Sequence, residues 1–231
     1  MERLKKAIRS RSNGSRHEAP DHEGRARCSG APQTRPGALG TARATGAMRN
    51  PGYVAFLRGI NVGGRKPVKM EDLREAFEAM GFQKVKTLLA SGNVLFDSSA
   101  SKAEPTAEKI EERLGKTFGH EIGVLVRPLA ELQKLAAVNP FKEVKMTPQT
   151  RLYVTFLAEK PEPGQAARFG STAKEFKMLR SSDREVCSAI TLSPQYHTTE
   201  LMSQLEKEFG RKVTTRNWNT VLRILDAAAS V

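Results

Sequence analysis

The sequence predicts an α+β fold that contains the same βαββαβ unit twice. Two repeats indicate the duplication: "YVAFL" at 53–57 returns as "YVTFL" at 153–157, and "IEERLGKTFGHEIGV" at 110–124 has a counterpart in "LMSQLEKEFGRKVTT" at 201–215. A third observation is that helix-like and strand-like apolar patterns alternate in the same order in both copies. A duplicated unit explains all three observations.

In the first copy, each element has its own signal. Gly81 and Gly119 each follow an apolar stripe of helical period, where a glycine suits a left-handed C-cap. Pro105 suits the start of the second of these helices, and the "SGN" turn joins two short apolar runs as in a hairpin. The strands expected are 53–58, 84–90, 93–97 and 121–127. This order is the ferredoxin-like split βαβ pattern.

The second copy repeats the order more weakly. We expect strands at 151–158, 174–180, 184–192 and 212–216, with helices at 164–172 and 198–209. One more amphipathic helix follows each copy, at 128–137 and at 217–229. Both first strands are apolar at nearly every position, which predicts burial on both sheet faces. The extra helices or the partner unit should therefore cover the open face of each sheet.

The basic charge is concentrated at the N-terminus. Residues 1–49 carry a net charge of +7 out of +13, and large apolar residues are almost absent from Arg9 to Ala47. We expect a disordered extension, followed by a first unit with its helix at 50–140 and a second at 141–231. The extension has two interpretations, a transit peptide or a start codon assigned too early; we favour the second, with Met48 as the natural start.

Composition excludes several classes of protein. The longest apolar runs are far shorter than the ~18 residues needed to span a bilayer. Cys28 and Cys187 lie far apart and lack a CxxC partner, so we expect neither a disulfide framework nor a zinc site. A cytoplasmic location and the absence of a membrane partner are the corresponding predictions.

The stretch "RGINVGG" at 58–64 follows the first strand and is the main candidate site. In a split βαβ unit, the loop after strand one and the hairpin between strands two and three emerge at the same end of the sheet. "RGINVGG" should therefore lie beside "SGN" at 91–93, and the second copy has neither the arginine nor the paired glycines. The candidate ligand-binding residues are Arg58, Gly59, Asn61, Gly63, Gly64, Ser91, Gly92 and Asn93.

Two interpretations of this corner remain open. Glycine-rich backbone and a nearby arginine can bind phosphate or carboxylate. Alternatively, the glycines allow positive φ in a tight loop while Arg58 and Asn61 bond loop carbonyls. The stretch matches neither a P-loop nor a GxGxxG fingerprint.

The chain resembles the bacterial domain of unknown function 1697 family at "LRGINVGG", "SGNVLF", "NPF" (139–141) and "TTRNWNTV" (214–221). The resemblance implies a duplicated α+β fold of ferredoxin-like halves and no established activity. Besides the candidate residues above, the signature of the family falls on Asn139, Pro140, Arg216, Asn217, Trp218 and Thr220.

The "RNWNT" segment at 216–220 also has two interpretations. Asn217 can cap the following helix while Trp218 packs between the units. Alternatively, Arg216, Asn217, Trp218 and Thr220 line a second polar site.

Recognisable catalytic and metal motifs are missing, so the sequence leaves open whether the protein is an enzyme. We expect no metal site, and no cofactor can be named. His197 should belong to a helix start and Cys187 to a strand in the core. Three functions remain: a module that binds a small anionic ligand, which we favour; a nucleic-acid-binding protein, which the missing RNP1 motif disfavours; or an enzyme acting on a phosphorylated or carboxylated substrate.

Overall fold

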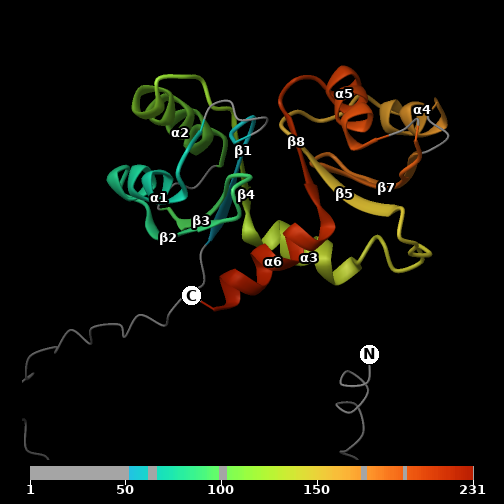
Figure 1. Cartoon of the computed structure of the whole chain (residues 1–231), viewed down its shortest axis with the longest axis horizontal. Helices are drawn as coiled ribbons and strands as arrows, with labels where there is room; N and C mark the ends of the chain where they lie inside the picture. Colours follow the sequence, from blue (N-terminus) through green and yellow to red (C-terminus); the bar gives the residue numbers. More distant parts are fainter. Residues whose placement is uncertain (1–51, 62–66, 99–102, 173–175, 195–196, 231) are drawn as a thin grey trace, which may run out of the picture. The chain divides into compact units, whose positions relative to one another are not determined.

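The computed structural model of this chain describes residues 52–61, 67–98, 103–172, 176–194 and 197–230 (Figure 1). All of them belong to one compact unit, Thr45–Val231. The expected basic extension 1–49, the alternative start Met48 and the candidate residues Gly63 and Gly64 therefore lie outside the described residues.

The described elements form two halves with the same order of strands and helices. The first half contains β1 (Tyr53–Leu57), α1 (Met70–Ala79), β2 (Gln83–Leu88), β3 (Asn93–Asp97), α2 (Ala103–Phe118), β4 (Val124–Pro128) and α3 (Leu129–Val138). The second half contains β5 (Thr150–Leu157), α4 (Gln165–Thr172), β6 (Phe176–Ser181), β7 (Glu185–Thr191), α5 (Thr198–Phe209), β8 (Val213–Asn217) and α6 (Trp218–Ala229).

Each half contains one four-stranded antiparallel sheet. The strand orders are β2-β3-β1-β4 and β6-β7-β5-β8, so the two sheets have the same topology. The registers also correspond: Val54 pairs with Arg127 in the first sheet, and Val154 pairs with Arg216 in the second. The predicted α+β fold of two ferredoxin-like βαββαβ units, each with an added helix, is confirmed.

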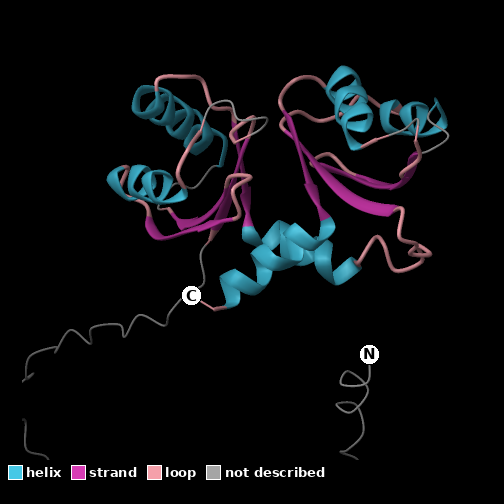
Figure 2. Cartoon of the chain, viewed as in Figure 1, coloured by secondary structure: helices cyan, strands magenta, loops and turns pink. Residues whose placement is uncertain are grey.

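One face of each sheet is covered by two helices of its own half (Figure 2). In the first half, Leu73 and Phe77 of α1 and Ile110 of α2 pack on this face. In the second half, Phe169 of α4 and Leu201 of α5 do the same. This burial explains why these helices form, because the apolar stripe of each one is removed from water.

The other face of each sheet is covered by α3 and α6, which lie together between the two sheets (Figure 1). A single core cluster joins Val54 of the first sheet, Val154 of the second, Leu132 of α3 and Val221 of α6. The prediction that the extra helices or the partner unit cover the open faces is therefore confirmed.

Residues of β1 alternate between these two cores. Val54 and Phe56 belong to the core between the halves, whereas Ala55 and Leu57 face α1 and α2. Phe56 also stacks on Phe156 of β5, with ring centroids 4.5 Å apart. Burial on both faces explains why the first strand is apolar at every position.

None of the described helices is both long and apolar enough to cross a membrane.

Candidate functional site

The end of β1 lies beside the hairpin between β2 and β3, as the topology predicted. The backbone N–H of Leu57 donates to the carbonyl of Gly92 at 2.8 Å. Gly59 follows with a positive φ of 67°, a conformation that glycine adopts without strain. The chain therefore turns sharply at Gly59, next to the hairpin.

Asn61 holds the loop closed with its side chain. Its Nδ2 donates to the carbonyls of Val68 and Ala90, both at 2.9 Å, while its Oδ1 accepts from the Val68 N–H at 2.8 Å. The residue has a φ of 55°, which asparagine tolerates better than most side chains. The Asn61 side chain thus ties the loop to itself and to the hairpin.

Gly92 is fixed in the hairpin by its surroundings. Its φ is +73°, and an added Cβ would lie 2.6 Å from Ile60 Cδ1 and 2.8 Å from Leu57 Cβ. A side chain at this position would therefore collide with the residues that form the turn after β1.

Asn93 begins β3 and is completely buried. Its Nδ2 donates to the Leu88 carbonyl at 2.9 Å and to Ser91 Oγ at 3.2 Å. Its Oδ1 accepts from Nε of Arg216 at 2.7 Å, across a separation of 123 residues. Asn93 therefore lies below the surface and connects the two halves through its hydrogen bond with Arg216.

Arg216, on β8, enters this corner from the second half. The residue is only 9% exposed, and its guanidinium lies 5.2 Å from the centroid of the Phe56 ring. Its donors bond Asn93 Oδ1 (2.7 Å), Leu57 O (2.7 Å), Thr214 Oγ1 (2.8 Å), Thr215 O (3.0 Å), Ser91 O (3.3 Å) and Gly92 O (3.4 Å). The five guanidinium N–H groups are thereby engaged.

All of these acceptors are neutral, and no carboxylate of the described residues lies within ion-pair distance of Arg216. Burial lowers the pKa of Arg216 to about 10, and the positive charge of Arg58 adds to the effect. A pKa of about 10 still leaves the guanidinium charged at neutral pH. Among the described residues, no carboxylate therefore compensates the positive charge that Arg216 places at the corner.

Arg58 follows β1 directly and remains partly open to solvent. Its side chain is 26% exposed, and its Nη2 donates to Glu206 Oε1 at 3.1 Å. Glu206 lies on α5 of the second half and is 50% exposed. Glu206 is the one hydrogen-bond partner of the Arg58 guanidinium in the described part of the chain, so other donors of this guanidinium remain for a ligand.

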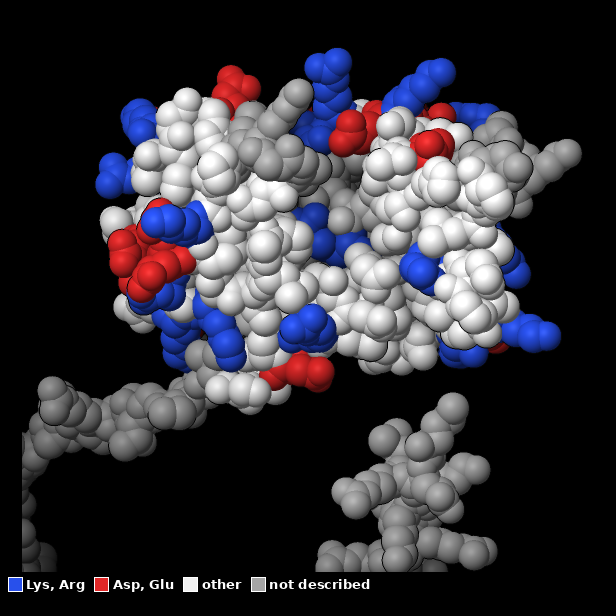
Figure 3. Space-filling view, viewed as in Figure 1, with Lys and Arg blue, Asp and Glu red and all other residues white. Residues whose placement is uncertain are grey.

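These residues line a cleft of about 890 Å³ between the two halves. One wall consists of residues 57–61 with Ala90 and Ser91; the other consists of side chains from α5 and residues 213–216 of β8. Figure 3 shows Lys and Arg side chains in the hollow between the halves. Of the predicted residues, the structure brings Arg58, Gly59, Asn61, Ser91 and Arg216 to this cleft.

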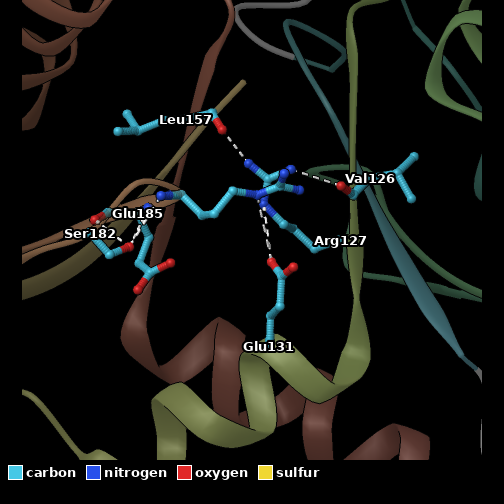
Figure 4. A network of polar contacts seen from close by, with 7 residues as sticks. Val126, Arg127, Glu131, Leu157, Ser182 and Glu185 are labelled. Atoms are coloured by element: carbon cyan, nitrogen blue, oxygen red, sulfur yellow. Dashed lines mark hydrogen bonds and ion pairs between the residues drawn. The ribbon is translucent and has the colours of Figure 1, made fainter. Parts of the chain in front are cut away.

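A second buried arginine, Arg127 on β4, occupies the position equivalent to Arg216. It is 3% exposed and donates to the carbonyls of Val126 and Leu157 (Figure 4). Leu157 ends β5 as Leu57 ends β1, so each arginine bonds the end of the first strand of the other half. Unlike Arg216, Arg127 has a carboxylate partner, Glu131, with Nε and Oε2 3.6 Å apart.

Sequence reasoning missed Arg127 and Glu206. An arginine at the end of a strand and a glutamate on an exposed helix face carry no local signal of function. The signal available for Arg127 was the duplication, because "VLVR" at 124–127 aligns with "VTTR" at 213–216.

The rest of the "RNWNT" segment points to helix capping and packing. Asn217 is the N-cap of α6, and its Oδ1 accepts from the Asn219 N–H at 2.9 Å. Trp218 packs against Phe141, with ring centroids 5.0 Å apart, and Thr220 lies in the first turn of α6. Asn217 and Trp218 also border a separate hollow of about 400 Å³.

In the described part of the chain, no cluster of three or more potential ligands is arranged for a metal ion. His197 is the N-cap of α5, and its backbone N–H donates to Glu200 Oε2 at 3.0 Å. Cys187 is fully buried in β7, and burial raises the pKa of its thiol to about 12. Both predictions, a helix start and a core strand, are confirmed.

Several solved structures match this chain, among them the following two. The conserved bacterial protein SP0830 from Streptococcus pneumoniae has 24% sequence identity and a TM-score of 0.61, and the alignment covers 77% of this chain and 98% of that protein. An unknown protein from Galdieria sulphuraria has 14% identity and a TM-score of 0.23, over 73% of this chain and 98% of that protein. The first similarity concerns the fold. No curated protein matches the sequence.

A family match covers more than half of the sequence. Residues 51–187 match the family described as "Protein of unknown function (DUF1697)". The matched region contains "LRGINVGG", "SGNVLF" and "NPF", three of the four motifs in which the resemblance was found. The chain therefore belongs to the DUF1697 family.

Proposed function

We propose that the cleft between the halves binds a small ligand through an anionic group, either phosphate or carboxylate. The observation that carries the proposal is that the cleft is lined by two arginines, Arg58 on one wall and Arg216 on the other. Arg216 has no carboxylate partner among the described residues. The positive charge of Arg58 is close enough to lower the pKa of Arg216. One of these two positive charges, that of Arg216, is buried, so an added anion would be attracted to it more strongly than in bulk water.

The two arginines have different roles in this proposal. The donors of Arg216 are engaged by protein acceptors, so its contribution is a fixed positive field from a poorly solvated position. Arg58 retains donors in the cleft and would contact the ligand directly, because a guanidinium matches phosphate and carboxylate geometry. Ser91 is close enough to line the same site.

Nucleic-acid binding has less support. RNA-binding modules with βαββαβ topology present an open sheet face on which bases stack. Here the corresponding faces are buried against α3 and α6, and Phe56 stacks on Phe156 instead.

Catalysis by amide polarisation is also less favoured. The Asn61 and Asn93 side chains are already bonded to loop and hairpin groups. Neither amide is left to polarise a substrate without breaking contacts that hold the corner together.

Ligand titration of the full chain tests the proposal, with inorganic phosphate and acetate as probes and backbone amide chemical shifts as the readout. Arg58→Ala should weaken binding by about ten- to a hundredfold, which corresponds to one charge-assisted hydrogen bond. Arg223→Ala is the matched control, because this exposed arginine of α6 does not line the cleft. Equal affinities for wild type and Arg58→Ala would remove this site from consideration.

A further inference from the structure

The cleft carries both signs of charge. Arg58 and Arg216 supply the positive groups, and Glu121 and Glu206 also line the cleft. A ligand with only negative charge would bring a third anion close to these carboxylates. A ligand with one group of each sign would bring a cationic group for these carboxylates as well.

The ion pair between Arg58 and Glu206 joins opposite walls of this cleft at 3.1 Å. Both side chains are partly exposed, and ion pairs of this kind contribute little to stability because water competes with them. Either partner can therefore exchange the other for a ligand group at small cost.

The same pair has no counterpart in the other half. The duplication aligns Arg58 with Ala158, since Leu57 and Leu157 end equivalent strands. It also aligns Glu206 with Gly115, since Leu205 matches Leu114. The duplicated fold therefore does not require this pair, and its presence is specific to the Arg216 side.

Hydroxyl groups accompany Glu206 on the wall that α5 provides. Thr199 and Ser203 are four residues apart, and Glu206 is three residues further, so all three lie on one face of the helix. An ammonium group has three donors and no acceptor, and a carboxylate with neighbouring hydroxyls can receive them.

From these observations we infer that the ligand is a small zwitterion, with its anionic group on Arg58 and its ammonium group on Glu206. The inference rests on the proposed function and adds the cationic group to it. When the ligand enters, the protein ion pair separates, and each partner gains an opposite charge from the ligand. Neither Arg58 nor Glu206 is left unpaired by the exchange.

The test compares amino acids with the same acids lacking the amino group. Glycine, β-alanine and γ-aminobutyrate are titrated against acetate, propionate and butyrate, using the full chain and amide chemical shifts. Within at least one matched pair, the amino acid should bind about tenfold more tightly than its deaminated partner, as one charge-assisted contact predicts.

The decisive variant is Glu206→Gln, because the inference predicts whether this substitution weakens or strengthens the binding of each ligand. It should weaken binding of the preferred amino acid by about tenfold and leave the deaminated acid unchanged or bound more tightly. Glu208→Gln, on the same helix but outside the cleft, should change neither affinity. If Glu206→Gln strengthens binding of both ligands, Glu206 is only a competitor for Arg58 and the inference is wrong.

The remaining outcomes separate this inference from the proposed function. If acids with and without an amino group bind equally well, with an affinity that Arg58→Ala lowers, the zwitterion inference is overturned and the proposed anion site is left standing. If no probe binds, or if binding ignores Arg58→Ala, both are overturned.

Discussion

The corners around Arg216 and Arg127 share one geometry and differ in charge. In both, a buried arginine on the last strand of one half bonds the carbonyl at the end of the first strand of the other half, Leu57 or Leu157. Arg127 has Glu131 as a counter-ion, whereas the acceptors of Arg216 among the described residues are all neutral. An arginine that bonds the first strand of the other half is therefore a feature of the duplicated fold, whereas a counter-ion for that arginine is not.

The β2–β3 and β6–β7 hairpins also differ in charge. Asn93 pairs with Phe56, and Glu185 pairs with Phe156, so a neutral amide in one half corresponds to a carboxylate in the other. Gly92 likewise corresponds to Arg184, since their carbonyls accept from Leu57 and Leu157. The first hairpin thus carries less charge than the second.

Substitution of the two buried arginines should have the largest effects on stability, and the size of the effect should differ between the two corners. Arg216→Met leaves Asn93 and Leu57 without their donor, and each buried acceptor left unpaired costs about 1 to 3 kcal/mol. We expect the free energy of unfolding to fall by at least about 3 kcal/mol. Arg127→Met should cost less, because Glu131 is 38% exposed and can be hydrated when its partner is removed. Urea denaturation of both variants measures the difference, and equal losses would contradict the distinction.

A side chain in the first hairpin should have an intermediate effect. Gly92→Ala combines a positive φ with contacts of 2.6 and 2.8 Å to Ile60 and Leu57. We expect a loss of about 2 kcal/mol in the free energy of unfolding, from backbone strain and overpacking. Arg184→Ala, at the equivalent position, should cost less than about 1 kcal/mol. Thermal unfolding followed by circular dichroism tests this, and a neutral Gly92→Ala would show that the hairpin can move.

The ion pair across the cleft should have the smallest effect on stability. A double-mutant cycle with Arg58→Ala and Glu206→Gln should give a coupling energy below about 1 kcal/mol, as for other exposed pairs. The coupling should decrease further in 1 M salt, where the Debye length is only about 3 Å. A coupling above about 2 kcal/mol would instead make the pair a structural link that no ligand separates cheaply.

Local patterns were sufficient to predict the order of the elements and most of their bounds to within two residues. The helix expected at 198–209 is α5 with the same bounds, and the apolar stripe of α1 ends before Gly81 as expected. The errors are at ends: α2 begins at Ala103, two residues before Pro105, and β4 begins at Val124 and not at Glu121. Apolar periodicity decides which element forms, whereas the terminal residues depend on capping and pairing.

The candidate site was predictable only within one half. The topology places Leu57 beside Gly92, because both belong to the same sheet. The contact between Asn93 and Arg216 links residues 123 positions apart and depends on how the two halves pack. The local pattern of neither residue reveals this contact: Asn93 was expected where the "SGN" turn enters a strand, and Arg216 where a strand meets the following helix.

The reciprocal bonds of Arg127 and Arg216 have a consequence for how the two corners can diverge. When residue i of one part contacts residue j of the other, and the reverse contact also exists, the contact has the pattern of an isologous interface in a homodimer. In a homodimer, one substitution changes both symmetric sites at once. A single chain that carries both copies is free of that constraint, so it can keep the arginine twice while placing Arg58 and Glu206 on one side only.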